Sequence, residues 1–77
     1  MGYYSPPTAY QDDPNILLIG QDFDGHWIVQ ENHGLAEGCF TTREAAVRYA
    51  EAERAHFPGA LVVLTPARLS MAYGHDA

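Results

Sequence analysis

Two short apolar runs constrain this chain most, and they lie at Ile16–Ile19 and Leu61–Leu64. Gly20 directly follows the first run and Pro66 closely follows the second, which indicates short strands rather than helices. Neither run alternates with polar residues, so each strand is apolar on both faces. One helix can cover only one face of a sheet. A fold built on these two strands must therefore shelter the other face in some other way or leave it exposed.

The segment between the two runs predicts a hairpin and a third strand. Asp24-Gly25 favours the positive backbone angles of a tight turn. The next five residues, Trp27–Glu31, form a strand in which the odd-numbered side chains share one face. A second turn leads to a third strand over Leu35–Phe40, which Gly38 weakens. The large apolar side chain of Trp27 is expected to anchor the core.

The third strand leads into a helix at a sharp corner. Thr41 lies three residues before Glu44, the spacing of a capping box, in which each residue bonds the backbone amide of the other. The alanine-rich helix is expected from Thr42 to His56, because Phe57-Pro58-Gly59 follows as a stop signal. Its small alanines allow close approach to a sheet. The buried stripe consists of Ala46, Val47, Ala50 and Phe57.

The sequence thus predicts an α+β fold over residues 15–68, with the order strand, strand, strand, helix, strand. The first three strands form an antiparallel meander and the helix packs on one face. A right-handed crossover then lays the fourth strand parallel to the first and beside it.

Both ends of the chain are expected to lie outside this fold. Residues 1–14 carry Pro6, Pro7 and Pro14 and are predicted to be a disordered leader. Residues 69–77 are predicted to be a flexible tail. An alternative for the leader is that its tyrosines lay an extended segment over an apolar patch: Tyr3, Tyr4 and Tyr10.

The charge of the chain restricts its partners. Four Lys+Arg residues stand against ten Asp+Glu residues, a net charge of −6 that phosphate backbones and anionic membranes repel. No apolar run reaches the length of a membrane span, and no secretion signal is present. We therefore expect a cytoplasmic protein that binds neither nucleic acid nor membrane.

The size of the chain points to self-association. The single cysteine, Cys39, rules out an internal disulfide, and no Cys-x-x-Cys pair offers a structural zinc site. Only about 50 residues are left to build a core, which is marginal without further support. Oligomerisation is the remaining common source of that support.

Three segments carry a resemblance to a known family, and they contain Trp27-Ile28-Val29, Phe40–Ala46 and Leu61-Val62-Val63. Their pattern resembles a family of small uncharacterised bacterial domains that read W-x-V, then F-x-T-x-x-E-A, then L-V-V. More distantly it is similar to the three-strands-plus-helix units of the YegP type. The resemblance implies the fold and no active site. Thr65–Arg68 departs from the family pattern, which leaves the length of the last strand open.

Three groups of residues could carry chemistry, and none of them predicts a catalytic residue, a cofactor site or a metal site. Asp22-x-Asp24-Gly25 partly overlays a calcium loop, but Gly20 stands where the first ligand belongs, so a plain hairpin turn is favoured. Cys39 has no base and orienting acid paired with it in sequence, so inert packing is favoured. The histidines lack ligand-pair spacing and fall on separate segments: His26, His33, His56 and His75.

The resulting hypothesis is a non-enzymatic module that self-associates or binds a protein partner through the uncovered sheet face. An exposed apolar surface of that kind usually marks an interface. Two alternatives remain open: a small-molecule- or metal-binding accessory domain of an enzyme system, and an acidic mimic that occupies a basic protein surface. The residues expected to contribute to the interaction surface are Leu17, Ile19, Ile28, Val62 and Leu64.

Overall fold

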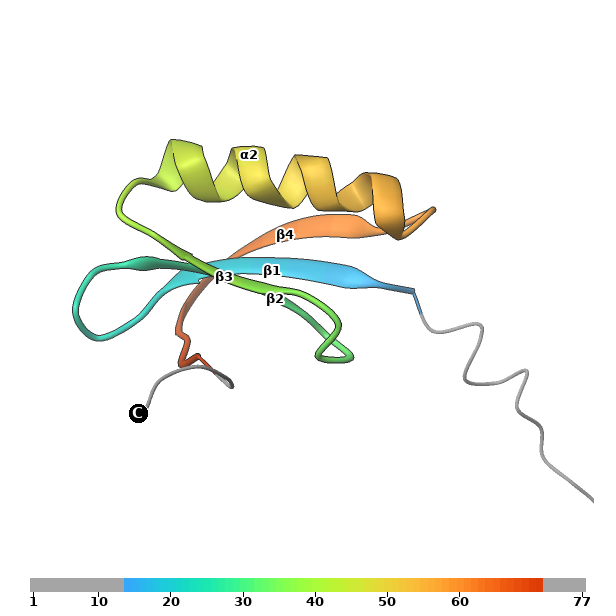
Figure 1. Ribbon diagram of the computed structural model, residues 1–77. Helices are drawn as coiled ribbons and strands as arrows, with labels where there is room; N and C mark the ends of the chain where they lie inside the picture. Colours follow the sequence, from blue (N-terminus) through green and yellow to red (C-terminus); the bar gives the residue numbers. More distant parts are fainter. Residues whose placement is uncertain (1–13, 72–77) are drawn as a thin grey trace, which may run out of the picture.

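One helix, α2 (Arg43–Glu53), lies across one face of a four-stranded sheet in the computed structural model, which describes residues 14–71 (Figure 1). The helix continues as a short 3-10 turn, η1 (Arg54–His56). The predicted α+β class and the order of the elements are confirmed. The predicted leader, apart from Pro14, and residues 72–77 of the predicted tail lie outside the described residues. The strands are β1 (Ile16–Gln21), β2 (Trp27–Glu31), β3 (Glu37–Phe40) and β4 (Leu61–Arg68).

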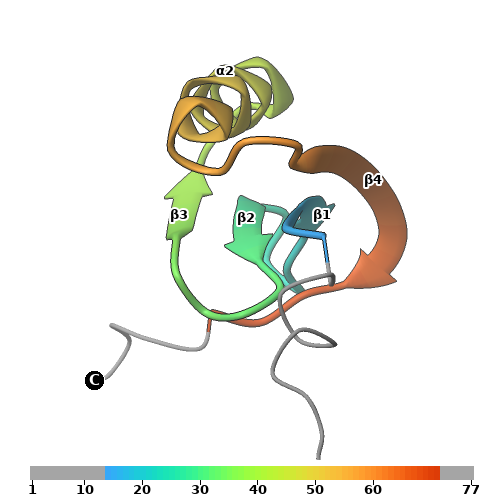
Figure 2. The same ribbon diagram turned by 90° about the vertical axis from the view of Figure 1, so that its right-hand side faces the viewer.

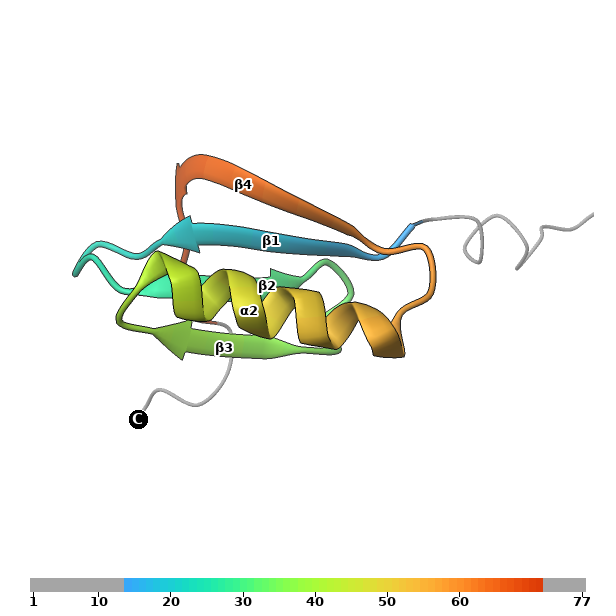
Figure 3. The ribbon, with the colours of Figure 1, turned by 90° about the horizontal axis from the view of Figure 1, so that it is seen from above.

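The strands lie in the order β3-β2-β1-β4, so β1 is central although it comes first in the described chain (Figure 3). β1 and β2 form the predicted hairpin, and β2 and β3 are also antiparallel. β4 runs parallel to β1, with Ile16 opposite Leu61 and Leu18 opposite Val63. The predicted position of β4, beside β1 and parallel to it, is therefore confirmed.

The core lies between α2 and the sheet. Leu17, Ile19 and Val29 point from the sheet towards α2 and have no exposed surface. Ala46 and Ala50 meet them from α2, and because these side chains are small the helix approaches the sheet closely. Around this centre pack larger, partly buried side chains, among them Trp27, Phe40, Val47, Tyr49 and Phe57.

The helix begins one residue later than the capping box predicts. The N-cap is Thr42, whose hydroxyl oxygen accepts a hydrogen bond from the amide of Ala45 at 3.1 Å. Thr41 is exposed and precedes the cap. Adjacent threonines made the sequence ambiguous at this point, and the backbone geometry resolves it in favour of the second: Thr42 is extended, with φ −127° and ψ 152°.

Replacing Thr42, the N-cap, is expected to lower the free energy of unfolding, whereas replacing the adjacent Thr41 is not. Thr42→Ala should lower the free energy of unfolding by about 1 kcal/mol, because an amide of the first helical turn loses its acceptor. Thr41→Ala, the matched control, should leave it within about 0.3 kcal/mol of the parent. Urea unfolding followed by circular dichroism measures both. Equal losses in the two variants would contradict the assignment of the cap.

The last strand is longer than predicted and curves beneath the sheet (Figure 2). It continues past Pro66 to Arg68, with an irregularity opposite the Ile19–Gln21 segment of β1. Proline is tolerated there because β4 is an edge strand and does not need every amide for pairing. The prediction of a short strand bounded by Pro66 is therefore wrong, because Pro66 lies inside β4.

The three residues after β4 also pack against the sheet. The amide of Leu69 donates to the carbonyl of Gln21 at 2.9 Å, and the side-chain amide of Gln30 donates to the carbonyl of Ser70. Leu69 fits over Gly20, where a Cβ atom would lie 2.9 Å from the Leu69 Cδ1 atom. Residues 69–71 therefore belong to the folded unit rather than to a free tail. Within residues 14–71, no helix is long and apolar enough to cross a membrane.

Candidate interaction surface

The face of the sheet opposite α2, called here the second face, is only partly exposed. Residues 69–71 cross it at the end of β1 that carries Gly20. Ile28 lies on this face beside Gly20, its register partner, and is fully buried. The prediction that Ile28 contributes to an exposed surface is therefore wrong, because the chain's own C-terminal segment covers this end of the face.

Two further predicted surface residues belong to the core. Leu17 and Ile19 are 0% exposed and point towards α2, so the prediction that they are accessible is also wrong. Val62, the register partner of Leu17, is half-buried and packs on the same core. An unbroken apolar run carries no alternation that would assign its side chains to a face, so the predicted surface combined residues from both faces.

Leu64 is the predicted residue that is clearly exposed, with 49% of its surface accessible. It is the register partner of Ile19, which is fully buried on the α2 side of β1. The helix lies over β1, β2 and β3, whereas β4 extends beyond the area it covers (Figure 3). Leu64 is exposed because it lies at the open edge of the sheet.

Among the described residues, three of the five exposed large apolar side chains lie on β4, while the other two, Phe23 and Leu35, lie in the turns on either side of β2. On the second face, Leu61 and Val63 are 54% and 38% exposed. Their register partners on β1, Ile16 and Leu18, are half-buried and continue the same surface. Together with Leu64 on the other side of the strand, these four residues form a continuous apolar surface, which we call the β4 patch.

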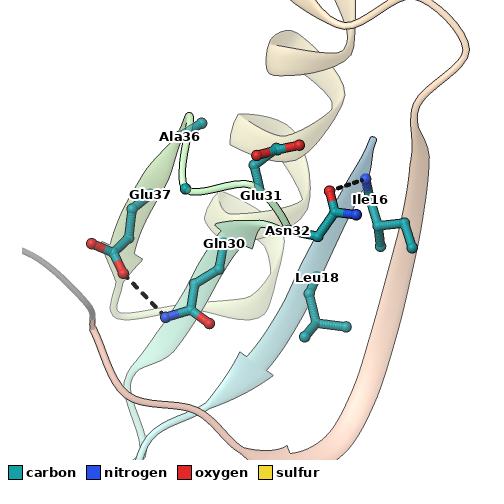
Figure 4. A pocket seen from close by; sticks show the side chains of 8 residues that line it. Ile16, Leu18, Gln30, Glu31, Asn32, Ala36 and Glu37 are labelled. Atoms are coloured by element: carbon teal, nitrogen blue, oxygen red, sulfur yellow. Dashed lines mark hydrogen bonds between the residues drawn. The ribbon is translucent and has the colours of Figure 1, made fainter. Parts of the chain in front are cut away.

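A pocket of about 400 Å³ adjoins the β4 patch on the second face (Figure 4). Ile16 and Leu18 form its apolar wall, and on the far side Gln30 donates a hydrogen bond to Glu37 at 3.1 Å. The Asn32 side chain accepts a hydrogen bond from the amide of Ile16 at 2.8 Å and fixes the start of β1. The lining of the hollow is mainly apolar, and Ile16 and Leu18 join it to the β4 patch.

A buried carboxylate, Glu31, organises the turn at the rim of this pocket. One oxygen accepts the amides of His33 at 2.6 Å and Leu35 at 3.1 Å. The other accepts the Asn15 side-chain amide at 2.7 Å and lies 2.7 Å from the His33 Nδ1 atom. Burial alone raises the pKa of Glu31, but these hydrogen bonds outweigh it and lower the pKa from 4.5 to about 2. With every acceptor position used, Glu31 holds the turn together and is not a free catalytic acid or base.

The calcium alternative is not supported by the geometry of the turn between β1 and β2. One Asp22 oxygen accepts the amides of Asp24 and His26, each at 2.9 Å, while Gly25 has a φ of +88°. Glu31, the last residue of the supposed loop, is engaged with Asn15 and His33. The residues form the hairpin turn that was favoured from the sequence.

Strand pairing does, however, bring together three groups that lie on separate segments of the sequence. Asp22, His26 and Cys39 each offer one donor atom, and these atoms all lie within 4.8 Å of one another. His33 lies beside Glu31, and His56 ends η1. His75 is outside the described residues.

Comparison of the chain with protein-family models, with curated proteins and with solved structures gave no match, so its resemblance to the small bacterial domains and to YegP-type units stays a prediction.

Proposed function

We propose that this protein is a self-association module in which β4 of one copy pairs with β4 of a second copy. The observation that carries the proposal is the β4 patch: an edge strand with exposed apolar side chains on both of its faces. An edge strand of this kind is a template for pairing with another strand. Pairing at the edge would cover Leu61 and Val63 on one face and Leu64 on the other.

The opposite edge of the sheet is a poorer candidate. β3 has only four residues, and its Gly38 contributes no side chain to a contact. β4 has eight residues, of which Leu61–Thr65 precede Pro66 and can donate every amide that faces outward. In an antiparallel pair of these segments about a two-fold axis, each contact of residue i with residue j is repeated as a contact of j with i, as in a closed homodimer.

The charge distribution does not oppose a contact between two copies at β4 itself. Two chains that each carry a net charge of −6 repel one another. Between Leu61 and Ala67, however, β4 has no charged residue, so its own contact adds no like-charge repulsion. Cys39 is exposed, but its thiol would stay reduced in the cytoplasm, where we place this module. A disulfide between two copies is therefore not part of the proposed contact.

The mass of the full chain in solution tests the proposal. Under reducing conditions, sedimentation of the wild-type protein should show a rise from 8.5 kDa towards twice that value as concentration increases. Val63→Lys should stay monomeric, because it places a charge in the proposed contact. Leu35→Lys is the matched control, since Leu35 is 65% exposed in a turn away from β4. A wild-type protein that remains monomeric at millimolar concentration would contradict the proposal, and so would equal behaviour of the two variants.

Salt is expected to strengthen this association. The contact is apolar, while the remaining surface of each chain is acidic, so screening removes repulsion without weakening the contact. Raising sodium chloride from about 50 to 500 mM shortens the screening length several-fold and should shift the equilibrium towards the dimer. Sedimentation at fixed protein concentration measures the shift. Dissociation on adding salt would instead indicate a contact based on ion pairs.

A further inference from the structure

We propose that Asp22, His26 and Cys39 form a binding site for a divalent transition-metal ion of the zinc class. Their donor atoms, a carboxylate oxygen, an imidazole nitrogen and a thiol sulfur, lie within 4.8 Å of one another. The site is independent of the β4 patch, since it involves the opposite end of β1 and the strands on the other side of it. The proposed self-association through β4 does not require this metal site.

The backbone itself brings the three residues together. Gln21 pairs with Trp27, and the next step of the hairpin sets Asp22 opposite His26, whose carbonyl accepts the Asp22 amide at 3.0 Å. Ile28 pairs with Cys39, so Cys39 is the diagonal neighbour of His26 across the next pair of strands. By the alternation of side chains, all three belong to the second face. The cluster therefore follows from the strand register and not from chance side-chain conformations.

The donor set matches zinc better than calcium or magnesium. Thiolate and imidazole are ligands of zinc and related metals, whereas calcium and magnesium prefer oxygen. In a tetrahedral zinc site with ordinary bond lengths, neighbouring donor atoms are roughly 3.3 to 3.6 Å apart. The Asp22 Oδ2 and His26 Nδ1 atoms are already 3.5 Å apart. Cys39 is exposed, and rotation of its side chain can bring the sulfur into range.

One of the donors is fixed before any ion arrives. The Asp22 Oδ1 atom accepts the backbone amides of Asp24 and His26, which leaves Oδ2 directed towards the His26 ring. An aspartate carboxylate is ionised at neutral pH, as a metal ligand must be.

The three residues leave a fourth coordination position for water or an external ligand. Three protein donors with one open position is the arrangement of zinc sites that bind further molecules. Asp22 also lines a hollow of about 280 Å³ whose opposite wall is formed by residues 69–71. His26 is 48% exposed, so an ion and a small ligand can reach the cluster from solvent.

Cobalt and zinc titrations of the reduced full chain test this proposal. We expect one Co²⁺ per chain with a thiolate-to-cobalt charge-transfer band in the near ultraviolet, and displacement of the cobalt by Zn²⁺. Cys39→Ser should abolish the band, and both Cys39→Ser and His26→Gln should weaken zinc binding by at least about tenfold. These exposed side chains can be changed without disturbing the fold, whereas Asp22 also holds the hairpin turn.

The control is His56→Gln, which removes the histidine at the end of η1 and should leave the zinc affinity unchanged. Calorimetry gives the affinity and the stoichiometry in the same experiment. A control variant that loses affinity as much as His26→Gln would overturn the proposal. So would one zinc ion per two chains, because that stoichiometry places the ion between copies. Since calorimetry can be done on the Val63→Lys variant as well, failure of the metal site is distinguishable from failure of self-association.

Discussion

Leu17→Ala is expected to remove most of the protein's free energy of unfolding at 25 °C. Leu17 is 0% exposed and lies between α2 and the sheet, in the core with Ile19 and Ala50. Truncating a buried leucine removes apolar contact and leaves a cavity, a loss of about 3 to 4 kcal/mol. A domain of this size rarely has more than about 3 to 5 kcal/mol of stability in total. Circular dichroism and urea unfolding of the variant measure the loss.

Leu35→Ala is the matched control for this experiment. It removes the same atoms, but from a side chain that is 65% exposed in the turn before β3. Its free energy of unfolding should stay within about 0.5 kcal/mol of the parent. A Leu17→Ala protein with the parent's urea midpoint would mean that Leu17 does not lie in the core.

Glu31→Gln should produce the second large effect, a loss of about 2 to 4 kcal/mol. The Glu31 carboxylate is buried and accepts hydrogen bonds from the amides of His33 and Leu35 and from the Asn15 side chain. A glutamine of the same size turns its own amide group towards one of these donors. That substitution replaces charge-assisted bonds by a contact between two donors, with no water to relieve it.

The same carboxylate predicts how stability changes with pH. Folding lowers the pKa of Glu31 from 4.5 to about 2. The contribution of this carboxylate to the free energy of unfolding is therefore fully present at pH values above its pKa in the unfolded chain. It is lost as pH falls from about 5 to 2, by an amount of about 3 kcal/mol for the full shift. In Glu31→Gln this part of the acid dependence should disappear. Urea unfolding at pH 7, 5, 4 and 3 measures it in both proteins.

Glu51→Gln controls for the loss of one negative charge. Glu51 is exposed on α2 and pairs with Arg54 at 3.0 Å, with both side chains about half accessible. An exposed pair of this kind contributes at most about 0.5 kcal/mol, so the variant should keep both the stability and the acid dependence of the parent. If Glu51→Gln and Glu31→Gln behaved alike, the buried network would not be the source of the effect.

Local patterns were sufficient to predict most of the fold. The Asp24-Gly25 turn, the alternation in Trp27–Glu31 and the stop signal at Phe57–Gly59 are each carried by a few neighbouring residues. With the handedness rule they also predicted the position of β4 beside β1, which the strand pairing confirms. The errors at Thr41 and Pro66 concern boundaries, where adjacent residues can serve the same role.

The candidate surfaces depend on pairing between distant segments, and there the sequence was insufficient. Nothing within Ile16–Ile19 tells which side chains face α2; that is fixed by the register against β2 and by the area that the helix covers. The Asp22, His26 and Cys39 cluster likewise requires the β2–β3 register, since no short spacing joins its members. Glu31 did carry a local signal, the turn residues directly after it, whose amides need an acceptor.

The central position of β1 has a consequence for how this chain is made. On the ribosome, β1 and β2 emerge early, but the strand that completes β1 on its other side is about 30 residues further along. At about 5 to 20 residues per second, the nascent hairpin waits for a few seconds before β4 is available. During that interval the free side of β1 is open to neighbouring nascent chains. Protection by a chaperone would matter most in those few seconds of translation.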